Sequence, residues 1–94
     1  MVLRFEWDPR KAAGNFVKNG GSFEEAATVF GDPLGRIADN PRHSTDEPRH
    51  VLLGHSERHR LLAVMFTDRE EVICLISARK PSRPERRQYE EGER

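Results

Sequence analysis

The sequence lacks several features that define common classes of protein. Its 94 residues contain one cysteine, Cys74, which excludes a secreted scaffold held together by disulfides. No apolar run approaches the roughly 20 residues of a membrane-spanning helix, and the N-terminus has no signal-peptide-like apolar stretch. The net charge is zero, because 16 basic residues balance 16 acidic ones, whereas disordered chains usually carry a large net charge. We therefore expect one folded domain over residues 1–94, located in the cytoplasm.

Several motifs of known chemistry are also absent. There is no glycine-rich phosphate loop and no G-x-S-x-G elbow. His55 and His59 are four residues apart, but they fall in an expected turn and do not form the H-E-x-x-H motif of a helical zinc site. Cys74 lies between apolar residues, which is typical of a buried small side chain rather than a catalytic thiolate. We expect no metal site and no cofactor.

Charged side chains are abundant, at 34% of the residues, and the bases are mostly arginine: 13 arginines against three lysines. Guanidinium groups form bidentate contacts with phosphate or carboxylate, so the bias favours a polyanionic ligand or an acidic protein partner. A genome rich in G and C would give the same bias through its codons. Both explanations remain open on the sequence alone.

The first half of the chain predicts one strand and two helices. Within residues 2–7, apolar side chains from Leu3 to Trp7 alternate with charged ones, as expected for a strand. Asp8, followed by proline, is a typical helix N-cap, and two glycines from Gly20 onward end that helix. A second cap, Ser22 in an S-x-x-E pattern, begins a helix whose apolar residues recur at helical spacing until Gly31.

The second half predicts strands and a last helix. A polar segment holds at most a short strand near residues 35–38. Three apolar runs follow, separated by gaps of hairpin length: 50–53, 60–67 and 72–78. Ser82 begins another S-x-x-E box and a helix through Tyr89, with a frayed tail at 90–94. The expected class is α+β, a small antiparallel sheet of three to four strands packed with two N-terminal helices and a C-terminal helix.

The first expected helix carries basic and amide side chains along one face. These are Lys11, Asn15 and Lys18, and such a stripe suits a phosphate or an acidic partner. An ordinary solvated helix face has the same composition, so the pattern alone does not decide. The opposite side carries four apolar residues that we expect to face the core: Ala12, Ala13, Phe16 and Val17.

A second basic feature lies at the end of the last apolar run. Strand alternation places Arg79 on the same face as Ile73 and Leu75, which would hold its guanidinium at the rim of the sheet. A rigidly held cation there suits the stabilisation of charge in a transition state, although an arginine that merely leaves the core for solvent gives the same pattern. Arg49 begins another expected strand and could converge on the same rim.

Taken together, these segments resemble the BrnT-type toxins. The resemblance rests on F-E-W-D-P-R-K from Phe5, on S-F-E-E-A-A-T-V-F from Ser22 and on I-S-A-R-K ending at Lys80, in the family's order and spacing. It covers nearly the whole chain. Two positions depart from the family pattern, because Asn19 stands where the family has a histidine and Cys74 where it has an arginine.

This resemblance implies a RelE-like fold and a ribonuclease toxin of a type II toxin–antitoxin system, which cleaves RNA and arrests growth. It implies a cognate BrnA-like antitoxin, a ribbon-helix-helix protein that silences the toxin in a two-plus-two complex. Operator DNA would be bound only through that antitoxin. The implied chemistry is metal-independent: the RNA 2′-hydroxyl attacks the adjacent phosphorus and leaves a cyclic phosphate. Because Asn19 and Cys74 depart from the pattern, the alternative is a catalytically degenerate relative that only binds the antitoxin in a repressor complex.

The implied chemistry assigns roles to residues of this sequence. Arg49 and Arg79 are expected to clamp the phosphate, and Lys18 to position RNA or balance charge. Glu47 and His50 are the candidates for the general base, although His50 is not part of the family pattern. Further RNA-binding residues are expected along the same basic features: Lys11, Asn15, Lys80 and Arg83.

Overall fold

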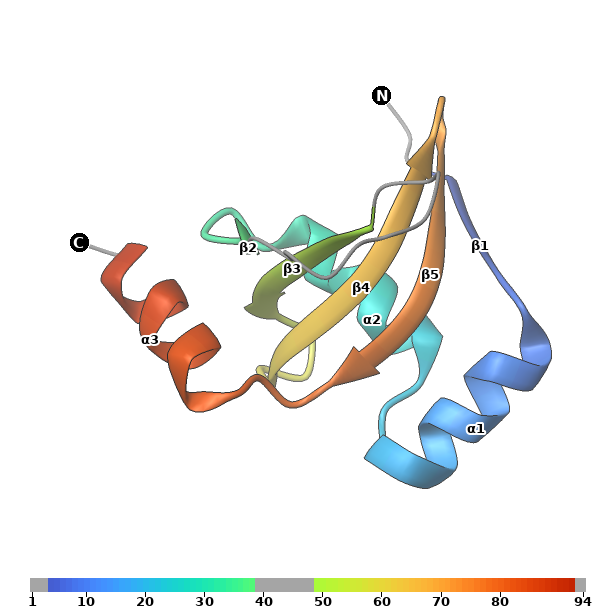
Figure 1. Ribbon diagram of the computed structural model, residues 1–94, viewed down its shortest axis with the longest axis horizontal. Coiled ribbons are helices and arrows are strands. Elements are labelled where there is room, and N and C mark those ends of the chain that lie inside the picture. Colours follow the sequence, from blue (N-terminus) through green and yellow to red (C-terminus); the bar gives the residue numbers. More distant parts are fainter. Residues whose placement is uncertain (1–3, 39–48, 93–94) are drawn as a thin grey trace.

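The computed structural model describes residues 4–38 and 49–92, in which five strands form one mixed sheet (Figure 1). The strands, in sheet order, are β1 (Arg4–Trp7), β5 (Val72–Arg79), β4 (Leu61–Arg69), β3 (His50–His55) and β2 (Arg36–Ala38). The helices are α1 (Pro9–Asn19), α2 (Phe23–Thr28) and α3 (Arg83–Gly92), with a short 3₁₀ helix η1 (Val29–Gly31) after α2. None of the described helices is long and apolar enough to cross a membrane.

The α+β class is confirmed, but the sheet is larger than expected and is not purely antiparallel. β1 pairs in parallel with β5, and Arg4 lies opposite Val72. The alternation of side chains within β1 predicts a strand, but it says nothing about a partner this distant in sequence. The last helix also continues beyond Tyr89, to Gly92, so the tail expected to fray from Glu90 is partly helical.

Side chains fix where the helices begin, as their sequences predict. The Asp8 carboxylate accepts a hydrogen bond of 2.8 Å from a backbone N–H in the first turn of α1. The hydroxyl oxygen of Ser22 accepts from the N–H of Glu25 at 3.0 Å. At α3 the box is complete, because Ser82 accepts from the N–H of Glu85 at 3.3 Å and donates its own N–H to the Glu85 carboxylate at 2.8 Å. These bonds satisfy N–H groups that a helix leaves without partners.

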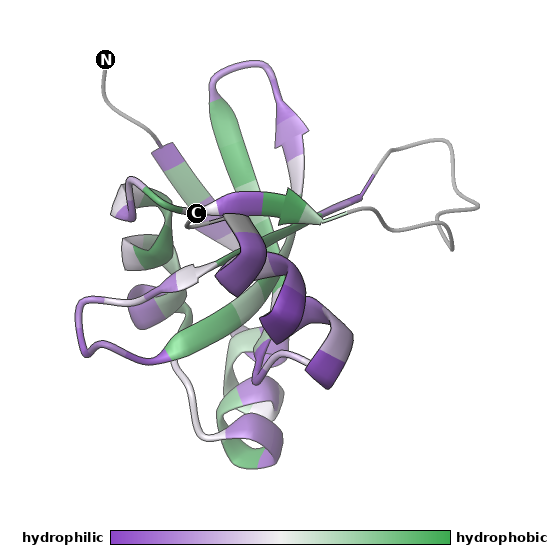
Figure 2. Ribbon diagram, turned by 90° about the vertical axis from the view of Figure 1, so that its left-hand side faces the viewer, coloured by the Kyte–Doolittle hydropathy of each residue, from purple (hydrophilic) through white to green (hydrophobic). Residues whose placement is uncertain are grey.

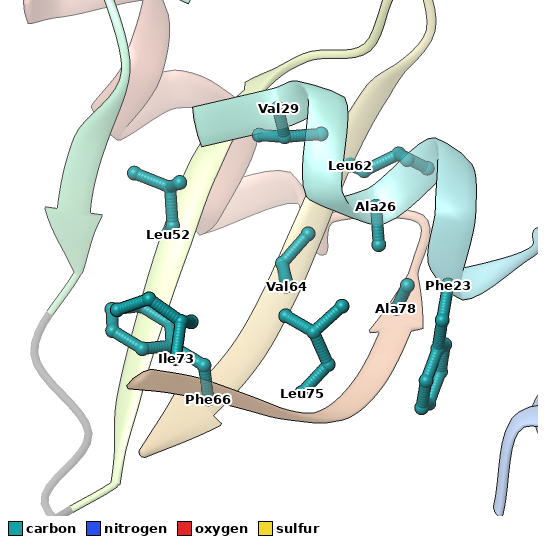
Figure 3. Close-up of a cluster of buried hydrophobic side chains, with 10 residues drawn as sticks. All are labelled: Phe23, Ala26, Val29, Leu52, Leu62, Val64, Phe66, Ile73, Leu75 and Ala78. Atoms are coloured by element: carbon teal, nitrogen blue, oxygen red, sulfur yellow. The ribbon is translucent and has the colours of Figure 1, made fainter. Parts of the chain in front are cut away.

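Two apolar layers cover the two faces of the sheet. On one face, the α2 face, Phe23, Ala26 and Val29 pack onto β3, β4 and β5 (Figure 3). On the other, the α3 face, Tyr89 is 2% exposed and packs with a smaller set of buried residues: Ala38, Val51, Leu53, Leu61 and Ala63. The mostly hydrophilic α3 lies over β2 and β3 (Figure 2), which leaves half-buried side chains on the α3 face of β4 and β5.

A β-bulge in β5 decides which side chains reach this open part of the α3 face. Two adjacent residues of β4 pair with Leu75 and Ser77, so Ile76 is an extra residue. Beyond the bulge, Arg79 pairs with Ala63, which belongs to the cluster on the α3 face. Strand alternation had predicted that Arg79 shares a face with Leu75. This prediction is wrong, because a bulge reverses the alternation and the pattern of residue types does not reveal it.

Hydrogen bonds, rather than apolar packing, dock α1 onto β5. Asn15 is 8% exposed, its amide donates to the carbonyl of Ala78 at 2.9 Å, and its side-chain oxygen accepts from the N–H of Ala78 at 3.1 Å. The apolar residues expected to face the core are largely solvent-facing, since Phe16 is 57% and Val17 is 87% exposed. Only Ala12 of that set packs against the core. Asn15 therefore holds the fold together and is not the solvent-facing RNA contact that the stripe predicted.

Candidate active site

A cleft of about 390 Å³ opens on the uncovered part of the α3 face, and we call it the Arg49 cleft. Trp7, Leu75 and Ile76 also line it, although the side chains of Trp7 and Leu75 belong to the apolar cluster on the α2 face. Its polar and ionisable lining residues come from four strands, or their ends, and the start of α1: Glu6, Asp8, Lys11, Arg49, Thr67, Arg69 and Cys74.

The strand register explains why these side chains meet. Glu6 pairs with Cys74, and Cys74 pairs with Thr67, so the three side chains form a row across β1, β5 and β4. Arg49 immediately precedes β3 and extends this row. Lys11 joins it because α1 begins directly after β1. Segments that are distant in the sequence thus bring their polar side chains together in the Arg49 cleft.

The Arg49 cleft places cations beside a carboxylate. Lys11 and Arg49 are exposed, and no acid among the described residues forms an ion pair with either. Glu6 is exposed in the same cleft, whereas the carboxylate of Asp8 is engaged as the cap of α1. Cations next to a group that can accept a proton suit phosphoryl transfer, in which protein groups position the reactants, balance charge and move protons.

A second cleft, of about 380 Å³, lies at the opposite end of β4 and β5, and we call it the Arg79 cleft. Besides these two strands, its lining residues come from the end of α1, the loop between β3 and β4 and the start of α3. Its ionisable lining residues are all bases: His55, His59, Arg60, Arg79, Lys80 and Arg86.

Two arginines of the Arg79 cleft are already paired with acids. Arg79 binds Glu85 through two hydrogen bonds of 2.7 and 3.0 Å, and this contact lowers the pKa of Glu85 to about 2. Arg60 forms an ion pair with the buried Glu25, whose carboxylate also accepts from the Ser56 hydroxyl at 2.6 Å. The hydrogen bond from Arg60 lowers the pKa of Glu25, although burial opposes the shift. Both acids therefore stay ionised at neutral pH.

The structure does not bring Arg49 and Arg79 together. Arg79 lies opposite Ala63, whereas the row of the Arg49 cleft crosses β4 at Thr67. Four residues of extended strand separate these positions, a distance of roughly 13 Å. In this arrangement the two arginines line different clefts, and Arg79 is engaged by Glu85.

The two candidates for the general base have different outcomes. Within a strand, successive side chains point to opposite faces, so His50 lies on the α2 face, away from Arg49. Its ring packs against that of Phe66 in a tilted arrangement with centroids 5.4 Å apart, and it lines neither cleft. Glu47 lies outside the described residues.

The other basic residues expected to contact RNA divide between the clefts and the open surface. Lys11 lines the Arg49 cleft and Lys80 lines the Arg79 cleft. Lys18 and Arg83 are exposed and line neither cleft. Among residues 4–38 and 49–92, no group of three or more His, Cys, Asp or Glu side chains is arranged to hold a metal ion.

Several lining residues were missed from the sequence. Glu6 and Thr67 alternate with apolar core residues of their strands, and Arg69 lies two residues beyond Thr67, but alternation alone does not show that these strands are neighbours. Cys74, expected to be buried, is half-buried and lines the Arg49 cleft. Asn19 lines the Arg79 cleft. The two departures from the toxin pattern thus fall one in each cleft.

We expect Glu85→Gln to lower the free energy of unfolding by about 1–2 kcal/mol at neutral pH, because it removes the ion pair with Arg79. The expected loss is small because Arg79 is partly exposed and solvent screens the pair. The pKa of Glu85 lies at about 2 instead of 4.5, so its ionised form stabilises the fold above about pH 4.5. That contribution is lost as the pH falls toward 2. Denaturant unfolding of both proteins between neutral and acidic pH measures it, and a difference that does not shrink on acidification would contradict the role of the charge.

A mixed sheet with helices on both faces and a cleft on its open face defines a small α+β protein. The fold matches the 1.1 Å crystal structure of the Brucella abortus ribonuclease toxin BrnT, with a TM-score of 0.66 and 19% sequence identity. The match covers 87% of this chain and 100% of that one. At this identity the likeness shows the fold alone. No curated protein matches the sequence significantly.

Membership of a family follows from the sequence itself. The model of the family described as the ribonuclease toxin BrnT of type II toxin–antitoxin systems matches residues 7–85. The chain therefore belongs to the BrnT family of ribonuclease toxins of type II toxin–antitoxin systems, which confirms the resemblance found in its motifs.

Proposed function

We propose that this chain cleaves RNA in the Arg49 cleft without a metal ion. The RNA 2′-hydroxyl loses its proton and attacks the adjacent phosphorus, and the bond from phosphorus to the 5′ oxygen of the next nucleotide breaks. The products are a 2′,3′-cyclic phosphate and a free 5′-hydroxyl. The observation that carries the proposal is the meeting of Arg49 and Lys11 with the carboxylate of Glu6 in one cleft.

Each group of the cleft has a role in this reaction. Arg49 contacts the non-bridging oxygens, whose negative charge grows in the pentavalent transition state. Lys11 adds a second positive charge and can donate a proton to the leaving 5′ oxygen. Glu6 accepts the proton of the 2′-hydroxyl, with Glu47 as the other candidate for the base.

The proposed biological role is that of a growth-arresting toxin held in check by its antitoxin. Membership of a type II family supports a protein antitoxin as partner. We propose a BrnA-like ribbon-helix-helix protein in a two-plus-two complex, which alone contacts operator DNA. The chain would act in the cytoplasm as a single domain over residues 1–94.

A second candidate function rests on one specific observation. Cys74 lines the Arg49 cleft at the position where the family pattern has an arginine, and Asn19 lines the Arg79 cleft where the pattern has a histidine. Each departure removes a group that can carry positive charge from a cleft. A chain weakened in this way would serve only as an antitoxin-binding partner in a repressor complex.

Cleavage of single-stranded RNA in excess EDTA tests the proposed reaction. We expect fragments with 5′-hydroxyl ends, and no cutting at a position that carries a 2′-deoxyribose, because the attacking group is then missing. Cutting at the 2′-deoxy position, or activity only after a metal is added, would contradict the mechanism. An inactive chain that gains cleavage as Asn19→His/Cys74→Arg would support the second candidate function instead.

A further inference from the structure

We propose that the Arg79 cleft is a second phosphate-binding subsite, which holds the RNA backbone at a distance from the bond broken in the Arg49 cleft. The proposal rests on the proposed function for the identity of the polyanion. The cleft itself, its charge and its position on the sheet are independent of that function.

The charge of the Arg79 cleft is unbalanced. Its ionisable lining residues are two histidines, three arginines and one lysine, without an acid among them. Glu25 and Glu85, which do not line the cleft, neutralise Arg60 and Arg79. Lys80 and Arg86 are exposed and form no ion pair with an acid in the described part of the chain. Two positive charges thus remain available for an anionic ligand.

The wall that carries the histidines is held in place before any ligand binds. In the loop between β3 and β4, His59 has a φ of 62°, and its N–H donates to the carbonyl of Ser56 at 2.9 Å. Positive φ is uncommon outside glycine, so the surrounding contacts must maintain it. The hydroxyl of Ser56 is bound to the buried Glu25, and Nδ1 of His55 lies 3.0 Å from the hydroxyl of Tyr89. A preorganised wall lowers the entropy lost on binding.

The position of the cleft suits a chain-like polyanion. Because of the bulge at Ile76, Arg79 lies on the same face of β5 as Cys74, which lines the Arg49 cleft. Five residues of strand separate Cys74 from Arg79, roughly 16 Å. The side chains on this face between them, Met65 and Ser77, are half-buried and leave the path open to solvent. One RNA backbone lying along β5 can therefore place different phosphates in the two clefts.

RNA fits this arrangement better than an acidic protein segment does. The repeated phosphates of one strand supply anions at both clefts, and the neighbouring cleft already presents Arg49 and Lys11 to phosphate. Neutralising phosphates releases counterions, so each contact adds to the salt dependence of binding. This property gives the subsite a measurable signature.

The test measures the binding of the full chain to a fluorescent, uncleavable 2′-O-methyl single-stranded RNA over a range of salt concentrations. The variant is Lys80→Ala/Arg86→Ala. The control is Arg87→Ala, which removes one positive charge from the position next to Arg86 in α3 and does not line the cleft. We expect the double variant to bind about tenfold or more weakly, and the slope of log affinity against log salt to fall by roughly 1.4 for two lost phosphate contacts. The control should stay close to the wild type.

Binding by the double variant that equals binding by Arg87→Ala would overturn the subsite, and so would a wild-type chain that binds no RNA. Unchanged RNA affinity together with lost antitoxin binding would assign the cleft to the protein partner instead. The outcome is separable from the proposed function. If the double variant binds RNA more weakly but the wild type does not cleave RNA, the subsite is supported and the proposed reaction is contradicted. If the wild type cleaves RNA but the double variant binds it as tightly as the wild type, the reaction is supported and the subsite is contradicted. Lys80 and Arg86 are both exposed, so we expect the double variant to fold, and its thermal unfolding is measured as a check.

Discussion

Arg49→Ala is expected to lower the rate constant of RNA cleavage by a factor of about 10²–10³, the usual cost of removing one group that stabilises charge in a transition state. Arg49 immediately precedes β3 and lines the same cleft as Lys11 and Glu6, and no described acid neutralises it. The guanidinium is therefore free to contact a phosphate that gains negative charge. The rate is measured under single-turnover conditions with the protein in excess over RNA.

Two further variants make this prediction specific. Arg10→Ala removes an exposed arginine of α1 that lines neither cleft, and we expect it to cleave at the wild-type rate. Arg49→Lys keeps the charge but loses the planar fork, so an intermediate rate is expected. A rate for Arg49→Ala equal to that of Arg10→Ala would show that the cleft is not the site of the reaction.

Asn15→Ala is expected to lower the free energy of unfolding by about 2–4 kcal/mol, because it leaves buried backbone groups without partners. The amide of Asn15 serves both the N–H and the carbonyl of Ala78, and also the carbonyl of Gly21 at 3.2 Å. Ala78 is 1% exposed, so water does not replace these bonds. Denaturant unfolding at equilibrium measures the loss.

The matched control for Asn15 is its neighbour, Phe16→Ala. Because Phe16 is 57% exposed, we expect its truncation to cost less than about 1 kcal/mol. The sequence had predicted the opposite order, with Phe16 in the core and Asn15 on the surface. A larger effect for Phe16→Ala than for Asn15→Ala would therefore show that α1 docks through its apolar side.

Local signals in the sequence predicted most of the elements of the fold. Asp8, Ser22 and Ser82 cap the helices as expected, because a cap depends on residues within one turn. The strands β3, β4 and β5 fall where the apolar runs predicted them, and β2 lies where the polar segment allowed at most a short strand. The parallel pairing of β1 with β5 and the bulge at Ile76 were not predicted, because both depend on contacts between segments distant in the sequence.

The candidate site could be predicted only in part for the same reason. Arg49 and Lys11 were proposed from their residue types and from the family motifs, and the structure places both in one cleft. Glu6 joins them only through the register of β1 on β5. The ion pair between Arg79 and Glu85 was not predicted either, because it depends on the position of α3 relative to the end of β5.

The central claim is that RNA is cleaved in the Arg49 cleft and held in the Arg79 cleft. Single-turnover cleavage of one RNA over a range of protein concentrations, for Arg49→Ala and for Lys80→Ala/Arg86→Ala side by side, tests it most directly. The account predicts that Arg49→Ala lowers the rate constant at saturation, whereas the double variant needs more protein to saturate and then cleaves at the wild-type rate. The reverse pattern, with the rate at saturation lost in the double variant and kept in Arg49→Ala, would contradict the account and move the reaction to the Arg79 cleft.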